Sequence, residues 1–145
     1  MQVLIDTNVL VRRIHRADAQ HRQARIALNR LIAGNHQLCV TSQNLIELWS
    51  VCTRPEDVNG LSLSHAQADA VLSRVEGAVY RLPDSDAVYP VWRDLVKRYG
   101  ISGKKSHDAR LVAVMIVHRV THVLTFNVGD FKRFSEIQAM EPGIG

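Results

Sequence analysis

Four acidic residues stand at corresponding places in four well separated segments of the chain. Asp6 follows directly on an apolar run, Glu47 lies about one turn into a helix after a second apolar run, Asp108 falls in the first turn of an apolar helix, and Asp130 follows a late strand. Open α/β sheets bind ligands beyond the carboxyl ends of their strands. We therefore expect the four carboxylates to meet at one edge of a sheet.

A cluster of carboxylates predicts a particular chemistry. Neighbouring carboxylates repel one another, so a cluster requires cations or shared protons. Mg²⁺ and Mn²⁺ take hard oxygen ligands and commonly serve phosphate chemistry. A bound metal makes water easier to ionise and steadies the charge on an oxygen that departs from phosphorus. The four acids therefore predict a metal-dependent site that cleaves phosphodiesters.

Each acid also has a purely structural interpretation. Asp6 would close a turn through its side chain, Asp108 would favour a helix N-terminus, and Asp130 would cap a short turn. Glu47 is harder to explain in this way, because it interrupts an otherwise apolar stretch at residues 45–49. A lone carboxylate is costly to bury unless it is paired or binds a metal. Taken together, the common edge favours the functional interpretation.

Basic residues lie close to these acids in the sequence. Arg12 and Arg13 follow the first strand, and Lys104 and Lys105 precede Asp108 in a Gly-containing loop. The chain carries a formal net charge of +4, which suits a polyanionic partner without identifying one. We expect these four cations to form a rim that holds a phosphodiester strand, although a solvated surface explains any one of them alone.

The elements that must position these residues alternate between strand and helix. Alternation of this kind predicts an α/β fold with a parallel sheet covered on both faces. Ser64 with Gln67 forms a capping-box pattern, and Ser106 is expected to cap an apolar, buried helix. The expected strands span residues 2–5, 38–40, 79–82 and 122–126. The expected helices begin after residue 8, at residue 18, after Thr41 or Ser42, after Ser64, at Asp84 or Ser85, and after Ser106, with a short helical turn at residues 131–134.

Composition sets the remaining bounds. A chain of 145 residues fits one domain, here residues 1–145. The two cysteines, Cys39 and Cys52, have no metal-ligand spacing and fall in apolar segments, so we expect buried, reduced thiols. The seven histidines are scattered and suggest no zinc site. Neither a secretory signal nor a membrane-spanning run is found, which predicts a cytoplasmic protein without a membrane partner.

At this point the ordered motifs resemble the PIN-domain family, and most closely the VapC-type toxins of prokaryotic toxin–antitoxin pairs. The resemblance extends over nearly the whole chain, and the four motifs are specific in their order more than individually. It implies an α/β/α sandwich with a mostly parallel sheet and a Mg²⁺- or Mn²⁺-dependent endoribonuclease. The motifs are Asp6-Thr7-Asn8, Glu47, His107-Asp108-Ala109, and Thr125-Phe126-Asn127 with Asp130-Phe131.

The resemblance also implies roles for individual residues and partners. Asp6, Glu47 and Asp108 match acids that hold metal, and Asp130 matches the fourth acid, with Asn127 as the alternative metal partner beside it. The matching residues that support the site are Thr7, Asn8 and Thr125, of which the two threonines contribute hydroxyl groups. Toxins of this type act on RNA, are commonly homodimers, and are held inactive by a cognate antitoxin.

Alternative functions remain open on the sequence alone. A haloacid-dehalogenase phosphatase would need an aspartate where Asn8 stands, and a receiver domain would need paired acids at the first strand, so both are disfavoured. A PIN-like module that binds RNA or protein without cutting is disfavoured because all four acids are present. A nuclease of RNA maturation without an antitoxin is the remaining enzyme alternative.

Overall fold

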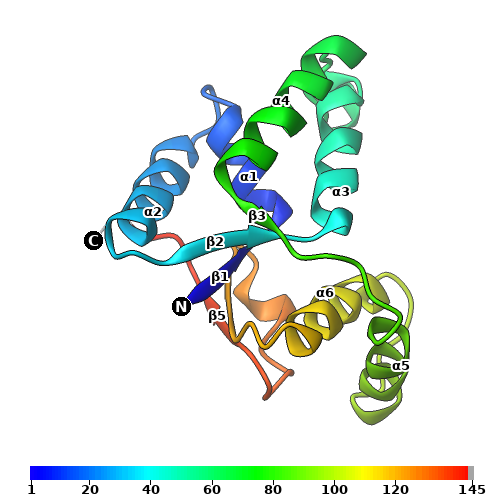
Figure 1. The fold of residues 1–145 in the computed structure, drawn as a ribbon. Coiled ribbons are helices and arrows are strands. Elements are labelled where there is room, and N and C mark those ends of the chain that lie inside the picture. The colour runs from blue at the N-terminus through cyan, green and yellow to red at the C-terminus, as the bar shows by residue number, and fades with distance from the viewer. Residues whose placement is uncertain (144–145) are drawn as a thin grey trace.

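The computed structural model describes residues 1–143 and consists of three layers. A sheet of five parallel strands has the order β3-β2-β1-β4-β5. Four helices cover one face of the sheet and two cover the other (Figure 1). This arrangement confirms the expected α/β fold with a parallel sheet between helical layers. The strands are β1 (Gln2–Ile5), β2 (Gln37–Val40), β3 (Tyr80–Arg81), β4 (His122–Leu124) and β5 (Gln138–Met140).

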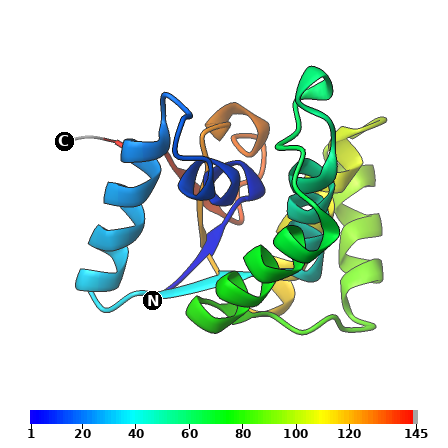
Figure 2. The same cartoon turned by 90° about the horizontal axis from the view of Figure 1, so that it is seen from above.

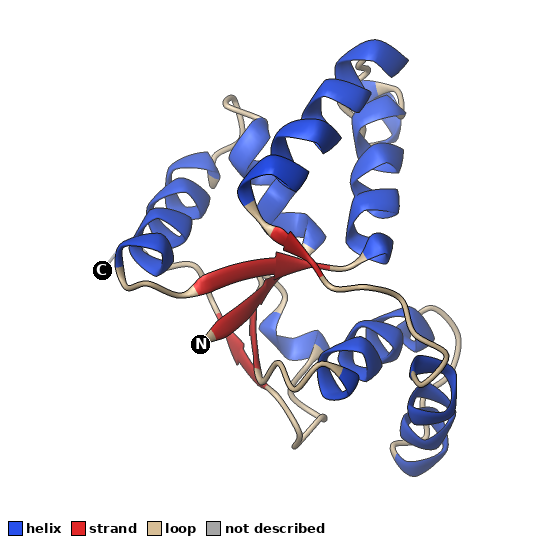
Figure 3. Cartoon of the chain, in the orientation of Figure 1, coloured by secondary structure: helices blue, strands red, loops and turns tan. Residues whose placement is uncertain are grey.

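The helices are arranged so that the first helix lies against the centre of the sheet. Seen from above, α1 lies between α2 on one side and the α3–α4 pair on the other (Figure 2). The helices α5 and α6 pack against each other on the opposite face (Figure 3). The helices are α1 (Thr7–Ile14), α2 (His21–Ala33), α3 (Ser42–Thr53), α4 (His65–Ala78), α5 (Val88–Arg98) and α6 (Lys105–Val117).

The central strand β1 explains why the core has two halves. Successive side chains of a strand point to opposite faces of the sheet. Val3 and Ile5 accordingly pack in a cluster with residues of α1 to α4, whereas Leu4 packs in a second cluster with residues of α5 and α6. All three side chains are fully buried, because β1 has a strand on each side and helices above and below. Residues 111–115 of α6 are also buried, as its apolar sequence predicted.

Helix starts follow the sequence where side chains cap them. Thr41 caps α3 through a capping box with Asn44, and Ser64 caps α4 through a capping box with Gln67. The second of these is the predicted box. Both satisfy backbone N–H groups that a helix start leaves without partners. Cys39 is buried and unpaired, and so is Cys52, as predicted.

Several expected boundaries were wrong. The helix expected from Asp84 or Ser85 begins at Val88, because the Ser85 hydroxyl instead accepts the Ala87 N–H (3.2 Å) in a preceding turn. Ser106 does not cap α6, which begins at Lys105; its hydroxyl donates to the carbonyl of residue 103 (2.6 Å).

Two further segments differ from the expectation. The helix expected from residue 18 begins at His21, because the Asp18 carboxylate binds the Gln20 N–H (2.8 Å) in a separate turn. The short helical turn expected at residues 131–134 lies at Val128–Asp130. Strand β5 was not predicted at all, because a three-residue edge strand carries no alternation to detect.

Within residues 1–143, none of the helices is both long enough and apolar enough to cross a bilayer.

Candidate active site

The acidic residues lie where the strand order changes direction. From β1 the chain builds the sheet through β2 to β3 on one side, and later through β4 to β5 on the other. A crevice forms beyond the carboxyl ends of the strands at such a point, and open α/β sheets bind ligands there. Asp6 directly follows β1, and Thr125 directly follows β4. The topology therefore places both residues at the expected binding edge.

Asp6 is the most firmly held of the four acids. It is 8% exposed and caps α1 by accepting the Thr7 N–H at 2.8 Å. Its carboxylate also accepts hydrogen bonds from the Thr125 hydroxyl (2.9 Å) and the Asn8 amide (3.3 Å). Burial raises the pKa of Asp6, and the charges of Glu47 and Asp130 add to that effect, although the hydrogen bonds from Thr125 and Thr7 act in the opposite direction.

Glu47 faces the same edge from α3. Its Oε2 accepts a hydrogen bond from the Thr7 hydroxyl (2.9 Å), and its Oε1 accepts one from the Gln43 amide (3.1 Å). Asn44 in turn donates from Nδ2 to the Thr7 hydroxyl oxygen at 3.1 Å. Thr7 therefore connects α1 to α3, and its hydroxyl orients Glu47.

Asp108 is positioned by the start of α6. The backbone of Gly103 has a φ of 64°, a left-handed conformation that suits glycine, and the helix begins two residues later. The pKa of Asp108 is raised to about 6, first by burial and then by the charges of Asp130, Asp6 and Glu47, while Lys105 lowers it. All three other acids thus act electrostatically on Asp108.

Asp130 and Asn127 occupy different environments. Asp130 ends the short turn Val128–Asp130, and its charge raises the pKa of both Asp6 and Asp108. Asn127 is exposed, and its backbone N–H donates to the Thr125 hydroxyl oxygen at 3.0 Å. The structure therefore brings the carboxylates of all four predicted acids into one electrostatically coupled group.

Two residues that the resemblance marked as supporting tie the segment after β4 to α1. Asn8 donates from Nδ2 to the Thr125 hydroxyl oxygen (3.1 Å), and its Oδ1 accepts the Phe126 N–H (3.1 Å). Thr125 is fully buried. These bonds fix the distance between the ends of β1 and β4, and with it the place of Asp6.

The four cations expected at the rim have different roles. Arg13, Lys104 and Lys105 are exposed, and Lys105 lowers the pKa of Asp108. Arg12 is structural: its guanidinium lies 4.8 Å from the centre of the Phe126 ring and donates to the Asn8 carbonyl (3.1 Å). It also bonds Gln20 at 2.6 Å and pairs with Asp18 at 3.9 Å.

Sequence reasoning missed two side chains that organise the acids, Gln43 and Asn44. The spacing of Gln43 and Glu47 is a detectable signal, because residues four apart face each other on a helix. Asn44 left no comparable signal, since its partner Thr7 lies 37 residues away and they meet only in the folded chain.

The donor set fits a hard divalent cation in its chemistry. Burial raises the pKa of Asp6 and Asp108, and the charges of neighbouring acids add to the effect; a positive ion relieves such repulsion. Mg²⁺ and Mn²⁺ favour oxygen ligands of this kind. Across residues 1–143, however, no three His, Cys, Asp or Glu side chains are grouped closely enough to hold a metal ion. The fit therefore rests on the kind of donor and on the mutual repulsion, and the ligands are not drawn into a closed set.

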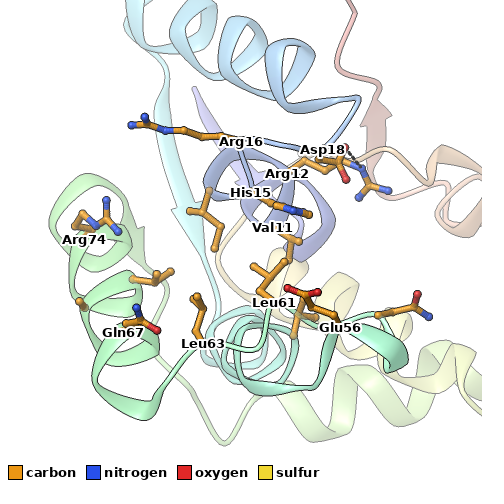
Figure 4. A pocket seen from close by; sticks show the side chains of 16 residues that line it. Val11, Arg12, His15, Arg16, Asp18, Glu56, Leu61, Leu63, Gln67 and Arg74 are labelled. Carbon is orange, nitrogen blue, oxygen red and sulfur yellow. Dashed lines mark ion pairs between the residues drawn. The ribbon is translucent and has the colours of Figure 1, made fainter.

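A large groove lies in a different place. A groove of about 1160 Å³ opens between the end of α1, the loop after α3 and α4. Figure 4 shows His15, Leu61 and Arg74 among the side chains around it, with the Arg12–Asp18 ion pair at one side. None of the four acids lines this groove. The candidate site is therefore identified by its chemistry and topology, and not by cavity size.

Several solved structures of other proteins share the fold of this chain. The chain resembles the DNA-bound VapBC of Salmonella typhimurium (TM-score 0.71, 18% identity, 99% of each chain covered). It also resembles VapBC-1 of nontypeable Haemophilus influenzae (TM-score 0.70, 16% identity, covering 97% of this chain and 98% of the other).

A third similar structure is the VapC20 toxin of Mycobacterium tuberculosis, described as cleaving the sarcin-ricin loop (TM-score 0.64, 22% identity, covering 94% of this chain and 98% of the other). Comparison with curated proteins gives no match. The family sequence model of the PIN domain matches residues 3–137. The match spans nearly the whole chain, including all four acids, and the protein belongs to the PIN domain family.

Proposed function

We propose that the protein is a metal-dependent endoribonuclease. The observation that carries this proposal is the meeting of four carboxylates from four separate elements at the point where the strand order reverses. Coupled carboxylates with hard-cation chemistry are typical of phosphodiester hydrolysis. The PIN domain match supports the same class of activity.

The metal would be held by Asp6, Glu47 and Asp108, with Asp130 or Asn127 as the fourth partner. When bound, Mg²⁺ or Mn²⁺ would ease ionisation of the attacking water and stabilise the departing oxygen of an RNA phosphodiester. Of the two candidates for the fourth place, Asp130 is favoured, because its charge acts on both Asp6 and Asp108.

The other side chains of the site would orient and bind. The Thr125 hydroxyl donates to Asp6, and the Thr7 hydroxyl donates to Glu47, so each carboxylate keeps one orientation. Partners of this kind commonly tune ligands that they do not replace. Lys105, which already lies in the electrostatic field of Asp108, would bind a phosphate of the strand.

We further propose that the protein is the toxin of a type II toxin–antitoxin pair. The similar structures include VapBC assemblies from Rickettsia felis and Salmonella typhimurium, both bound to DNA. On this proposal the chain works in the cytoplasm as a homodimer, and a cognate antitoxin covers the acidic site. Co-expression with the product of an adjacent small gene, followed by purification of the complex, tests the antitoxin.

The nuclease is tested by incubating a mixed RNA pool with Mg²⁺ or Mn²⁺, with and without EDTA. We expect the wild type to cut only with metal and Asp108→Asn to be inactive. Asp69→Asn is the matched control, because Asp69 is exposed on α4 and far from the acids in sequence. Cutting that persists in EDTA or in Asp108→Asn contradicts the proposal.

Two alternatives make different predictions in the same assay. A PIN-like module that binds RNA or protein without cutting would leave the pool intact although the purified protein is folded. An RNA-processing nuclease without an antitoxin would cut, but no neighbouring gene product would inhibit it. The presence of all four coupled acids favours the active enzyme over the binding module.

A further inference from the structure

A second, smaller hollow lies between α5 and the first turns of α6. Its volume of about 350 Å³ falls within the range of sites for small ligands or single ligand groups. Polar and aromatic side chains dominate its wall, with buried Val88 as the apolar member. The polar and aromatic residues of the wall include Ser85, Tyr89, Trp92, His107 and Arg110.

Tyr89 presents an exposed aromatic ring to this hollow. Its residue exposure is 61%, and its ring stacks on that of Trp92, with centroids 5.8 Å apart and planes at 28°. Trp92 is itself fixed, because its Nε1 donates to the Ser106 carbonyl at 2.8 Å. The pair therefore forms a flat, braced aromatic surface, of the kind that stacks well against another ring.

The hollow is directly linked to the acidic site. The Gln43 amide donates both to Glu47 Oε1 (3.1 Å) and to the His107 carbonyl (2.9 Å). Arg110 donates from Nη1 to the Gln43 Oε1 at 3.1 Å. His107 and Arg110 line the hollow, and Asp108 lies between them in α6. The wall of the hollow and the acidic site thus share Gln43.

The geometry points to a nucleobase subsite in which Tyr89 stacks one unpaired base of the RNA strand whose phosphodiester lies at the four acids. This inference rests on the proposed function, since it assigns a place to the substrate of that same site. Every base has a π-face, so an aromatic platform binds single strands with little dependence on sequence. His107 and Arg110 add polar groups at the edge of the platform.

Charge favours a nucleotide over an apolar ligand at this position. The Arg110 guanidinium is partly exposed (38% of the side chain), and besides its bond to Gln43 it pairs with the exposed carboxylate of Asp84 at 3.5 Å. Lys105 lies five residues before Arg110 in the same helix. A nucleotide whose base stacks on Tyr89 would therefore have Arg110 and Lys105 near its own phosphate. The phosphate of the adjacent nucleotide would then lie at Asp108.

The test measures binding without cleavage. Fluorescence anisotropy of a short labelled single-stranded RNA is recorded in EDTA and low salt for wild type, Tyr89→Leu and Tyr89→Phe. We expect Tyr89→Leu to weaken binding about tenfold, as the loss of one base stack does, and Tyr89→Phe to retain wild-type affinity. Tyr80→Leu is the control. Tyr80 is also exposed (48%), but it is the first residue of β3, and the acids lie beyond the other end of the strands.

A second measurement ties Tyr89 to one base. The same RNA is prepared with a single abasic position, moved along the strand. In the wild type, one position should weaken binding about tenfold, and in Tyr89→Leu the same position should have no further effect. Additive losses in the double change would overturn the inference, as would equal binding by Tyr89→Leu and wild type, or no binding of RNA by the wild type.

The possible failures are distinguishable. Because binding is measured in EDTA, a protein that stacks a base but never cuts RNA refutes the proposed nuclease and leaves the subsite standing. A wild type that cuts RNA while Tyr89→Leu binds normally refutes the subsite alone. Sedimentation of both proteins completes the test, since a dimer that becomes a monomer in Tyr89→Leu would assign the ring to an interface between two copies and overturn the subsite.

Discussion

The acidic site has two halves that are held in different ways. Asp6 and Glu47, the anchored acids, accept hydrogen bonds from Thr7, Thr125, Asn8 and Gln43. For Asp108 and Asp130, the unanchored acids, the described residues provide no side-chain hydrogen bond to the carboxylate, and the charges of the neighbouring acids act on Asp108 instead.

The fold alone orients the carboxylates of the anchored acids, whereas a bound cation is needed to complete the environment of the unanchored acids. Hydrogen bonds hold the anchored acids in one orientation with or without a cation. The unanchored acids are placed by the start of α6 and by the turn at Val128–Asp130, and burial together with the neighbouring charges opposes ionisation of Asp108. A cation should therefore change the unanchored acids far more than the anchored ones.

The largest expected effect comes from removing an anchored acid. Asp6→Asn should lower RNA cleavage by more than about 100-fold, because even partners behind a metal ligand contribute about 10- to 100-fold. The fold should persist, since the asparagine oxygen still accepts the Thr7 N–H. Single-turnover cleavage and circular dichroism measure the two outcomes, and a folded variant with wild-type activity would contradict the site.

The next effect comes from removing an anchor while keeping the acid. Thr125→Val deletes the hydroxyl that donates to Asp6 and accepts from Asn8 and from the Asn127 N–H. Because Thr125 is fully buried, we expect a loss of about 1–3 kcal/mol in the free energy of unfolding. Cleavage should fall about 10- to 100-fold.

Urea denaturation and cleavage kinetics measure both quantities for Thr125→Val. Thr125→Ser is the matched control, because it restores the hydroxyl and should recover most of the activity. If serine and valine behave alike, the hydroxyl does not anchor Asp6.

Replacing an unanchored acid should raise the free energy of unfolding, whereas Thr125→Val should lower it. The pKa of Asp108 is raised from 3.8 to about 6, so the folded state keeps a proton that the unfolded state has lost between these values. The free energy of unfolding therefore falls as pH rises through this window, and Asp108→Asn avoids the loss. In EDTA we expect the variant to be more stable than wild type by about 1–2 kcal/mol at pH 7.5, after allowance for solvent screening.

Urea denaturation at pH 3.5 and 7.5 checks this prediction. The advantage of Asp108→Asn should nearly disappear at pH 3.5, where the carboxyl is mostly protonated in both states. Saturating Mg²⁺ should also remove it at pH 7.5, because the cation stabilises the ionised wild type alone. A variant that is less stable than wild type at pH 7.5 in EDTA would show that Asp108 is anchored after all.

The smallest effect concerns the cations beside the unanchored acids. Lys104 and Lys105 are both exposed, and Lys105 is the one whose charge lowers the pKa of Asp108. Lys105→Ala should reduce the salt dependence of RNA binding by about one phosphate contact. Lys104→Ala is the control and should retain the wild-type slope. Equal slopes for wild type and Lys105→Ala would remove Lys105 from the strand-binding rim.

The anchored half also shows what the sequence could and could not predict. Asp6 was predictable, because an apolar run followed by polar turn residues indicates where a buried strand ends. Glu47 was predictable because it interrupts an apolar stretch. The bonds of Asn44 and Thr125 were not, since each joins residues far apart in the chain and depends on how the strands are ordered.

The unanchored half was predictable in position and less so in detail. Asp108 lies in the first turn of α6 as expected, but the helix begins before Ser106, because a left-handed Gly103 and a hydroxyl bond reshape its start.

Arg12 shows the same limit of sequence-based prediction outside the acids. Its sequence position suggested a phosphate contact, whereas its guanidinium packs on Phe126 and donates to the Asn8 carbonyl.

The central position of β1 has a consequence for biosynthesis. β1 and Asp6 are synthesised before the other strands of the sheet, whereas the neighbouring strand β4 and the hydroxyl of Thr125 are added more than a hundred residues later. Until then the nascent chain contains β1 to β3 and the helices α1 to α6, without the strands β4 and β5 on the other side of β1. Asp130 comes later still. A ribosome-bound chain that stops before residue 130 therefore carries only part of the acidic site, so any cutting activity is withheld while the protein is still being made.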